Sequence, residues 1–471
     1  MIASIASIAL IALALAPPRA AGQESARPDT APARTAAGVA SDGRQLDSLT
    51  ALALGENPKI KAAAERADAA RHRVVIAGSR SDPMLMAGIQ NLPLGKESAP
   101  SMGGATLERS GPDPMTMRML GVTQSIPYPG KLALRQRVAA HEARSADAGV
   151  ESARREVVRD VKDAYYELAF LDQALAIVAR NRDMIASVIR VTDARYGLGT
   201  AAQQDVLKAR LEASRLAETA SNLTEQRHAA LARLNALLSR ASETSVDSPT
   251  VPSRIVRAAG GNAPEDVRFV SNALGARAAG SPLPDLVTLQ ETAIANDPTL
   301  REHEAMIDAQ LSRVELARKE RLPDVDVAVQ YGQRGGGLPD MVSASVSVPL
   351  PIFRRRKQNE GVLEATAQLH ALHAEHEAAA NDLRASVARL VSELERQRTQ
   401  LALYTRAMLP QGRATLTATA GSFQVGKTDL LAVLDVQSML FTTETDYFRA
   451  LTDFARNLAE LERLTGKEIG S

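Results

Sequence analysis

The feature that most constrains this chain is a long stretch without proline. No proline occurs between Pro129 and Pro249, and only Gly149 interrupts residues 131–196. A helix over that range would extend for about 97 Å, far beyond the diameter of a globular domain. Because helices in proteins gain most of their stability from packing, we expect other long helices to lie along this one.

Heptad patterns in both halves support this expectation, because apolar residues recur at alternating spacings of four and three. Gln397 is a polar interruption that can fix the register, and Pro410 is expected to kink or end its helix. An ordinary dimeric coiled coil would show similar seams. The first seam is Val157, Val161, Ala164, Leu168, Leu171, Leu175 and Val178; the second is Leu383, Val387, Leu390, Leu394, Gln397, Leu401, Tyr404 and Met408.

The chain also contains an internal repeat. Each half reads as a helix, a pair of strands, a long helix, a glycine-containing turn and another helix. Gly199 in the first half corresponds to Gly426 in the second. The matching segments are 54–83 with 293–323, 122–131 with 345–354, and 195–210 with 422–437.

The repeat predicts the domain organisation. An apolar run suggests a signal peptide over 1–22, although no Lys or Arg precedes it, and a single membrane anchor is the alternative. A flexible leader over 23–44 follows. The repeats are expected over 45–240 and 286–466, with a linker or equatorial segment over 241–285. The expected helical hairpins cover residues of about 131–238 and 354–464.

Four segments read as strands, and their lengths match those of strands that cross a bilayer in a β-barrel. They cover residues 84–92, 115–126, 325–334 and 341–348. Four strands cannot close a barrel, and open edges are forbidden in lipid. Three chains would supply twelve strands. The predicted fold class is therefore mainly α, with four strands per chain contributing to a trimeric twelve-stranded membrane β-barrel; two soluble hairpins that cap a coiled coil are the alternative.

The stretch GSFQVGKTD (421–429) fits the phosphate-loop pattern G-x-x-x-x-G-K-[ST]. A phosphate loop needs a buried strand before it, whereas residues 413–420 are at best a weak strand. Its twin in the first repeat, RYGLGTAAQ, lacks the Gly-Lys-Thr triplet. We therefore interpret both glycines as tips of helical hairpins and expect no nucleotide.

Composition excludes other classes of function. The chain has no Cys, so disulfides and thiolate metal sites are ruled out, and its net charge of +1 gives no reason to expect nucleic acid. We find no nucleophile elbow and no H-E-x-x-H motif, and we expect neither an enzyme nor a cofactor.

Five motifs stand out in the two repeats: SDPMLMAGIQNLP, DPMTMRMLGVTQSIPYPGKLALR, VSVPLPIFRRRK, RYGLGTAAQQDVLKAR and SFQVGKTDLLAVLD. With these motifs, both repeats resemble the TolC-like outer membrane efflux proteins, or outer membrane factors, in particular the heavy-metal (CusC- and CzcC-like) branch. The resemblance covers residues of about 46–466. It implies a homotrimer in the outer membrane of a Gram-negative bacterium, extending into the periplasm. It further implies a periplasmic adaptor (membrane fusion protein) and an inner-membrane RND-type pump as partners.

The resemblance also implies a gate at the hairpin tips. Asp205 holds the place of an Asp in a closing hydrogen-bond network, Phe423 that of a Tyr, and Thr428 that of a cation. Asp435 matches an acidic residue that points into the pore, so three copies would form a carboxylate ring that favours cations. A solvated helix charge is the alternative for Asp435. The candidate tip residues are Gly199, Gln204, Asp205, Phe423, Gly426, Lys427, Thr428 and Asp435.

Two groups of residues are weak metal candidates. Met115, Met117 and Met119 share one strand face, and thioethers suit Cu(I) and Ag(I); an apolar stripe that faces lipid or packs is the blander interpretation. His373 and Glu377 share a helix face and could hold a divalent ion, or simply be solvated.

The function that we predict is a passive, gated channel of a tripartite efflux system, conducting heavy-metal cations across the periplasm and outer membrane. The first alternative is the same channel for drugs or other organic compounds. The second, from a different class, is a periplasmic adaptor or structural coiled-coil protein. Adaptors have one hairpin per chain, so two complete repeats favour the channel.

Overall fold

The structure, a computed structural model, describes residues 44–91, 116–247, 249–260, 283–334 and 338–469. The expected signal peptide and nearly all of the expected leader lie outside the described residues. Arg44, the last residue of that leader range, already begins helix α1.

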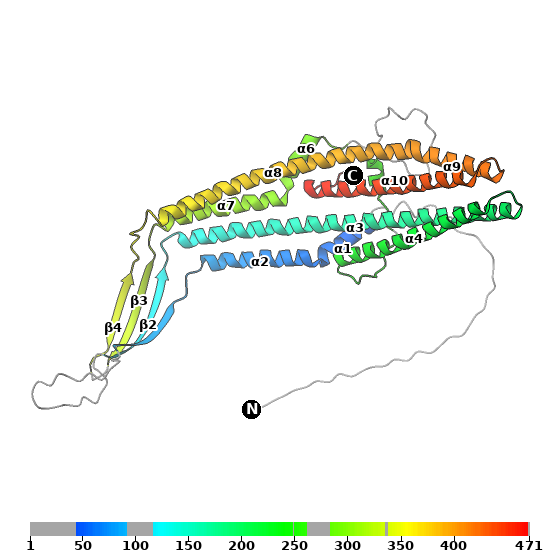
Figure 1. Cartoon of the computed structure of the whole chain (residues 1–471). Helices are drawn as coiled ribbons and strands as arrows, with labels where there is room; N and C mark the ends of the chain where they lie inside the picture. The colour runs from blue at the N-terminus through cyan, green and yellow to red at the C-terminus, as the bar shows by residue number, and fades with distance from the viewer. Residues whose placement is uncertain (1–43, 92–115, 248, 261–282, 335–337, 470–471) are drawn as a thin grey trace, which may run out of the picture. The chain divides into compact units, whose positions relative to one another are not determined.

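The long helix expected from the proline-free stretch is present as α3, Lys131–Gly197, an uninterrupted α-helix of 67 residues. With α4, Gln203–Leu237, it forms the first hairpin (Figure 1). The second hairpin consists of α8, Gln358–Leu403, a π-helical turn, Tyr404–Met408, then α9, Leu409–Gln424, and α10, Leu430–Thr465.

Pro410 does not end the helical path, contrary to one of the two expected outcomes. It lies in the first turn of α9, directly after the π turn. Proline lacks an N–H and its ring clashes with the carbonyl four residues earlier, and a π turn relieves both problems. The extra residue in that turn also rotates the following helix face. This explains why the second seam is buried from Leu383 through Tyr404, whereas Met408, its last predicted member, is 47% exposed.

Shorter helices precede each pair of strands, and their caps show the repeat directly. They are α1, Arg44–Glu56, and α2, Pro58–Gly78, in the first half, and α6, Leu286–Asn296, and α7, Pro298–Lys319, in the second. Asn57 caps α2 and Asp297 caps α7, each accepting backbone N–H bonds, with proline at the first helical position. A further short helix, α5, covers Ser253–Ala258.

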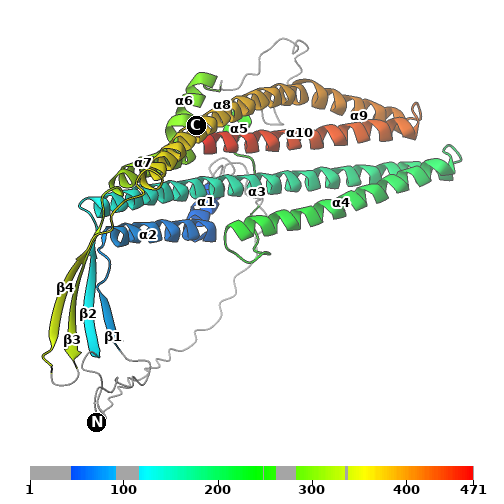
Figure 2. The ribbon, with the colours of Figure 1, turned by 60° about the vertical axis from the view of Figure 1, so that its left-hand side comes forward.

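The four strands form one antiparallel sheet in the order β1-β2-β3-β4 (Figure 2). They are β1, Met84–Gln90, β2, Met117–Ile126, β3, Val325–Arg334, and β4, Met341–Ser347. The central pairing, β2 with β3, joins the two repeats over the whole of both strands. Strands β1 and β4 are therefore the two edges.

The main core lies where α10 packs along both α3 and α8, with α1, α6 and α7 added around them. Gln397 is 3% exposed in this core, and its Oε1 atom accepts a hydrogen bond from Asn457 of α10.

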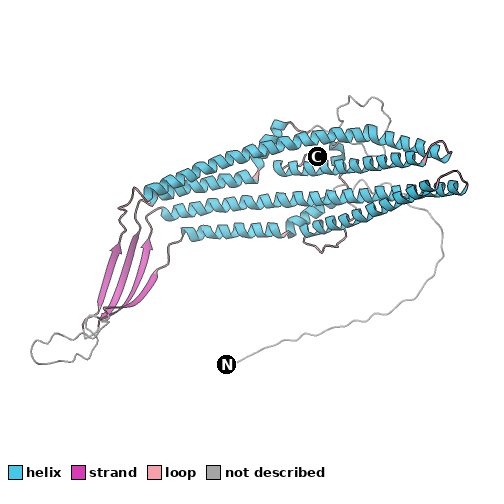
Figure 3. Cartoon of the chain, in the orientation of Figure 1, coloured by secondary structure: helices cyan, strands magenta, loops and turns pink. Residues whose placement is uncertain are grey.

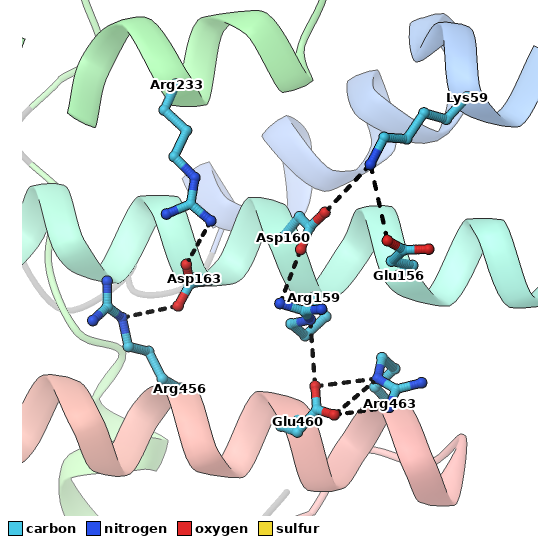
Figure 4. A network of polar contacts seen from close by, with 9 residues as sticks. All are labelled: Lys59, Glu156, Arg159, Asp160, Asp163, Arg233, Arg456, Glu460 and Arg463. Carbon is cyan, nitrogen blue, oxygen red and sulfur yellow. Dashed lines mark hydrogen bonds and ion pairs between the residues drawn. The ribbon is translucent and has the colours of Figure 1, made fainter. Parts of the chain in front are cut away.

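Ion pairs connect α3 to its neighbours (Figure 4). Lys59 of α2 pairs with Asp160, and Asp163 pairs with Arg233 of α4 and Arg456 of α10. Apolar seams and ion pairs together hold the two hairpins lengthwise.

Strands and helical turns occupy opposite ends of the described unit. Figure 3 shows the strands gathered at one end of the helices, and Figure 1 shows the α3–α4 and α9–α10 turns at the other. No helix among the described residues combines the length and apolar character needed to span a bilayer.

Candidate functional site: hairpin turns and the faces of the sheet

The two hairpin turns have the same hydrogen-bonding geometry. In the first, Gly199 N–H donates to the Tyr196 carbonyl and Thr200 N–H to that of Arg195. In the second, Gly426 and Lys427 donate to the carbonyls of Phe423 and Ser422 in the same pattern. Gly199 and Gly426 have φ values of +74° and +75°. Each turn is thus a Schellman motif, in which glycine adopts the left-handed conformation at low cost.

This geometry explains the apparent phosphate-loop match. Residues 413–420, at best a weak strand candidate by sequence, are helical within α9. Gly421 lies in the same helix, and its match to the first glycine of a phosphate loop is coincidental. A phosphate loop follows a strand, whereas this turn joins two antiparallel helices.

Phe423 joins the two hairpins next to their turns. Its side chain is 4% exposed in a small apolar cluster with Val188 of α3, Ala209 of α4 and Val433 of α10. Tyr196, the equivalent residue in the first repeat, is 48% exposed. The repeat has therefore given its two aromatic residues different roles.

Arg195 completes this link from the last turn of α3. Its guanidinium lies 5.0 Å from the centre of the Phe423 ring, and Nη1 donates to the Phe423 carbonyl at 3.2 Å. A Cβ atom on Gly426 would lie 3.0 Å from Arg195 Nη2, so the glycine also leaves room for this arginine. Arg195 could not be identified from the sequence alone, because its partners lie in the other repeat; the only signal was its position three residues before the turn pair Leu198–Gly199.

The other predicted tip residues lie around the same turns without forming one network in the described part of the chain. Gly199, Gln204, Lys427 and Asp435 are exposed, and Asp205 and Thr428 are partly buried. Among the described residues, Asp205 and Asp435 have no ion-pair partner. The turns also expose apolar side chains: Leu198 is 79% and Val425 is 69% exposed.

The strand register separates two chemically different faces of the sheet, because directly paired residues point to the same side. One face is aliphatic across all four strands, with Leu85 opposite Val122, Val122 opposite Val329 and Val329 opposite Ala344. Polar residues occur on it only near the strand ends. Members of this aliphatic face are Leu85, Ala87, Ile89, Leu120, Val122, Val327, Val329, Tyr331, Val342, Ala344 and Val346.

The opposite face carries the methionines together with small and polar residues. Met117 and Met119 lie on it as predicted for one strand face, and Met115 lies outside the described residues. Met84 and Met86 of β1 and Met341 of β4 share this face. Ser, Thr, Gln, Asp and Gly fill most of the remaining positions, and Ala328 and Arg334 the others, which makes this the polar side of the sheet.

The helical metal candidates remain apart from other ligands. His373 and Glu377 are both exposed on α8. Within the described ranges, no group of three or more His, Asp or Glu side chains is arranged to hold a metal ion. The structure thus offers no preformed site of nitrogen and oxygen ligands in the part of the chain that it describes.

Comparisons with known proteins agree with this architecture. The chain is 23% identical over 426 residues to the cobalt-zinc-cadmium resistance protein CzcC of Cupriavidus metallidurans, covering 90% of each chain. Its fold is similar to that of the outer-membrane channel OprN, with a TM-score of 0.70, 17% identity, and 95% of this chain and 98% of that chain covered. The outer membrane protein VceC of Vibrio cholerae gives 0.68, with 17% identity and coverage of 90% and 96%.

A family described as outer membrane efflux protein matches residues 49–240 and 289–467, so that each half of the chain contains one matched segment. These two segments include both hairpins and all four strands. The chain belongs to the outer membrane efflux protein family.

Proposed function

We propose that this chain is one of three subunits of a channel that exports metal cations through the outer membrane. Family membership supports transport rather than catalysis. The sheet supports a trimer. Its aliphatic face continues across four strands, while β1 and β4 remain unpaired edges among the described strands. In lipid these edges must be paired, and three copies of the sheet would close one barrel.

In this arrangement the aliphatic face contacts lipid and the polar face lines the channel. The methionines would then line the lumen, which is opposite to the interpretation that they face lipid. A lumen of Ser, Gln and Met side chains suits the passage of hydrated or weakly held cations. Soft Cu(I) and Ag(I) would bind thioethers more strongly than Zn(II) or Co(II).

The hairpin turns are proposed as the periplasmic end, where the adaptor docks. Leu198 and Val425 expose apolar surface at equivalent positions of the two turns, which supports a contact with another protein there. Asp435 of three subunits would form the carboxylate ring near this end, and Asp205, Gln204, Lys427 and Thr428 would contact neighbouring subunits. Energy would come from an inner-membrane pump.

The absence of native cysteine allows a direct test of the trimer. Ala87→Cys on β1 and Ala344→Cys on β4 would be combined and treated in cells with a short bis-maleimide. We expect cross-linked dimers and trimers in the outer-membrane fraction, because β1 of one subunit would lie beside β4 of the next. Each single variant serves as the control and should give no trimer. A monomer in the soluble or inner-membrane fraction would favour an adaptor and contradict the proposal.

The metal substrate rests on the CzcC relative, whose name specifies cobalt, zinc and cadmium resistance. A deletion strain should be tested against copper, silver, zinc, cadmium and cobalt, beside hydrophobic drugs and dyes. Sensitivity to metals alone supports the proposal. Sensitivity to drugs alone would retain the channel and replace its substrate with organic compounds.

A further inference from the structure

The segment between β4 and α8, residues 348–357 (VPLPIFRRRK), carries two kinds of exposed side chain. Leu350, Ile352 and Phe353 are 76%, 80% and 75% exposed. Arg354, Arg355, Arg356 and Lys357 follow at once and are also exposed. We call residues 348–357 the junction segment; it joins the sheet to the second hairpin (Figure 1).

Within the described residues, the four cations of the junction segment have no side-chain hydrogen bond or ion pair. The equivalent junction of the first repeat differs. There Lys131 is 4% exposed, and its Nζ atom donates to Asp324 Oδ1 at 2.7 Å and to the Leu322 carbonyl at 2.8 Å. Lys131 at the first junction thus forms bonds within the fold, whereas the four cations at the second junction remain exposed.

A cavity of about 470 Å³ lies against the junction segment. Its lining includes Lys131, Arg135 and Lys357 as cations, Glu320 and Asp324 as carboxylates, and Gln358 at the start of α8. Gln358 Oε1 is buried and receives no hydrogen bond within the described part of the chain. Lys131 pairs with Asp324, so Arg135 and Lys357 outnumber Glu320, and the cavity offers a net positive charge to an anion. It also offers one free acceptor to a hydroxyl or ammonium group.

We propose that this cavity and the junction segment bind the phosphate headgroup of an anionic phospholipid, with Leu350, Ile352 and Phe353 beside its acyl chains. This inference rests on the proposed placement of the sheet in a membrane. Along the chain, β4, which has one aliphatic face, is followed by apolar and aromatic side chains and then by cations, an order typical of a membrane–water interface. Arginine forms paired hydrogen bonds with phosphate oxygens, and long cationic side chains reach headgroups while their stems stay apolar.

The charges and apolar side chains of the junction segment favour an anionic lipid over a zwitterionic lipid or free phosphate. A zwitterionic choline headgroup would bring its own cation next to four others. Free phosphate would satisfy the arginines and leave the three exposed apolar side chains in water. An anionic lipid would pair with the cations and also cover the apolar side chains. In phosphatidylglycerol, a headgroup hydroxyl can also donate to Gln358.

Native mass spectrometry of the detergent-purified full chain tests this proposal. The protein would be titrated with dioleoyl phosphatidylglycerol, dioleoyl phosphatidylcholine or inorganic phosphate. We expect phosphatidylglycerol to remain bound to the trimer and phosphatidylcholine to dissociate. Replacing Arg354, Arg355 and Arg356 with Gln should weaken phosphatidylglycerol binding on the order of a hundredfold, at about fivefold per charge.

A matched control replaces three exposed arginines, Arg182 and Arg190 of α3 and Arg240 just beyond α4, with Gln and should bind as the wild type does. Equal retention of both lipids by the wild type would overturn the inference, as would undiminished binding by the junction variant. Competition by inorganic phosphate at equal concentration would assign the site to a free anion instead. The same spectra report the oligomeric state, so a trimer without lipid preference refutes only this inference, whereas a monomer refutes the proposed channel.

Discussion

Arg195 and Phe423 connect the two helical hairpins beside their turns: the guanidinium lies 5.0 Å from the ring centre and donates to the Phe423 carbonyl at 3.2 Å. The two residues are 228 positions apart in the sequence, so the chain itself does not hold them together. The link therefore connects the two hairpins directly beside their turns, where the proposed gate would lie.

Arg195→Gln should loosen the tips without unfolding the hairpins, because it removes a cation–π contact and a hydrogen bond worth about 1–2 kcal/mol together. We expect faster hydrogen exchange at residues 195–200 and 422–427. Arg210→Gln is the control, since Arg210 pairs with Asp193 inside one hairpin. Unchanged exchange in both turns would show that Arg195 does not hold them together.

Phe423→Ala should destabilise the protein by about 3–5 kcal/mol, because it leaves a cavity in a buried apolar cluster. Tyr196→Ala, at the equivalent position of the first repeat, should change stability by less than about 1 kcal/mol, since that ring is half exposed. Denaturant unfolding in detergent, followed by circular dichroism, compares the two. Similar losses would contradict the different roles assigned to these aromatic residues.

Glu462→Gln should cost about 3 kcal/mol, because it leaves Lys162 buried without its partner. The control is a second Lys–Glu pair, whose N–O distance equals the 2.6 Å between Lys162 and Glu462 but whose side chains are exposed. Lys61 and Glu56 lie 2.6 Å apart, with both side chains more than half exposed, so Glu56→Gln should change the unfolding midpoint much less than Glu462→Gln does. Equal effects on the unfolding midpoint would mean that burial does not determine the strength of these pairs.

Acid should weaken the packing of α3 against α10 through Glu460 (Figure 4). Burial alone would raise the pKa of Glu460, but the hydrogen bond from Arg463 and the charges of Arg463, Arg159 and Arg389 outweigh it and lower that pKa. A carboxyl whose pKa falls on folding stabilises the folded state above its unfolded pKa. That contribution is lost as the pH falls through the lower, folded value.

The measurement is the unfolding midpoint of the wild type and of Glu460→Gln between pH 7 and pH 3. We expect the wild type to be more stable at neutral pH and the difference to shrink in acid. A difference that stays constant with pH would argue against the ionised carboxyl as its cause.

Asp435→Asn should reduce the preference of the reconstituted channel for cations over anions by at least about twofold, because three charges would leave the proposed ring at once. Reversal potentials in planar bilayers under a salt gradient measure this preference. Glu225→Gln, an exposed change on α4, should leave it unaltered. An unchanged reversal potential in Asp435→Asn would identify this residue as a solvated helix charge.

Local signals in the sequence determined much of the fold. The absence of proline after Pro129 predicted α3, and the repeated Asn-Pro and Asp-Pro pairs mark the starts of α2 and α7. Glycine at equivalent positions predicted both turns, since a Schellman motif depends on the few residues around it. Alternation of side chains indicated the strands, because their period is also local.

Only the tertiary structure decided which of these elements meet. The β2–β3 pairing crosses the repeats and determines which residues share a face, so the methionines lie opposite the aliphatic side chains. Phe423 is buried and Tyr196 exposed, although both precede a turn glycine in the same pattern. Arg195 became visible as a site residue only through its contact with Phe423. The physical reason is that the sequence pattern specifies which surface an element must bury. Which strand it pairs with, in which register, and which ring Arg195 contacts depend on residues that are hundreds of positions apart.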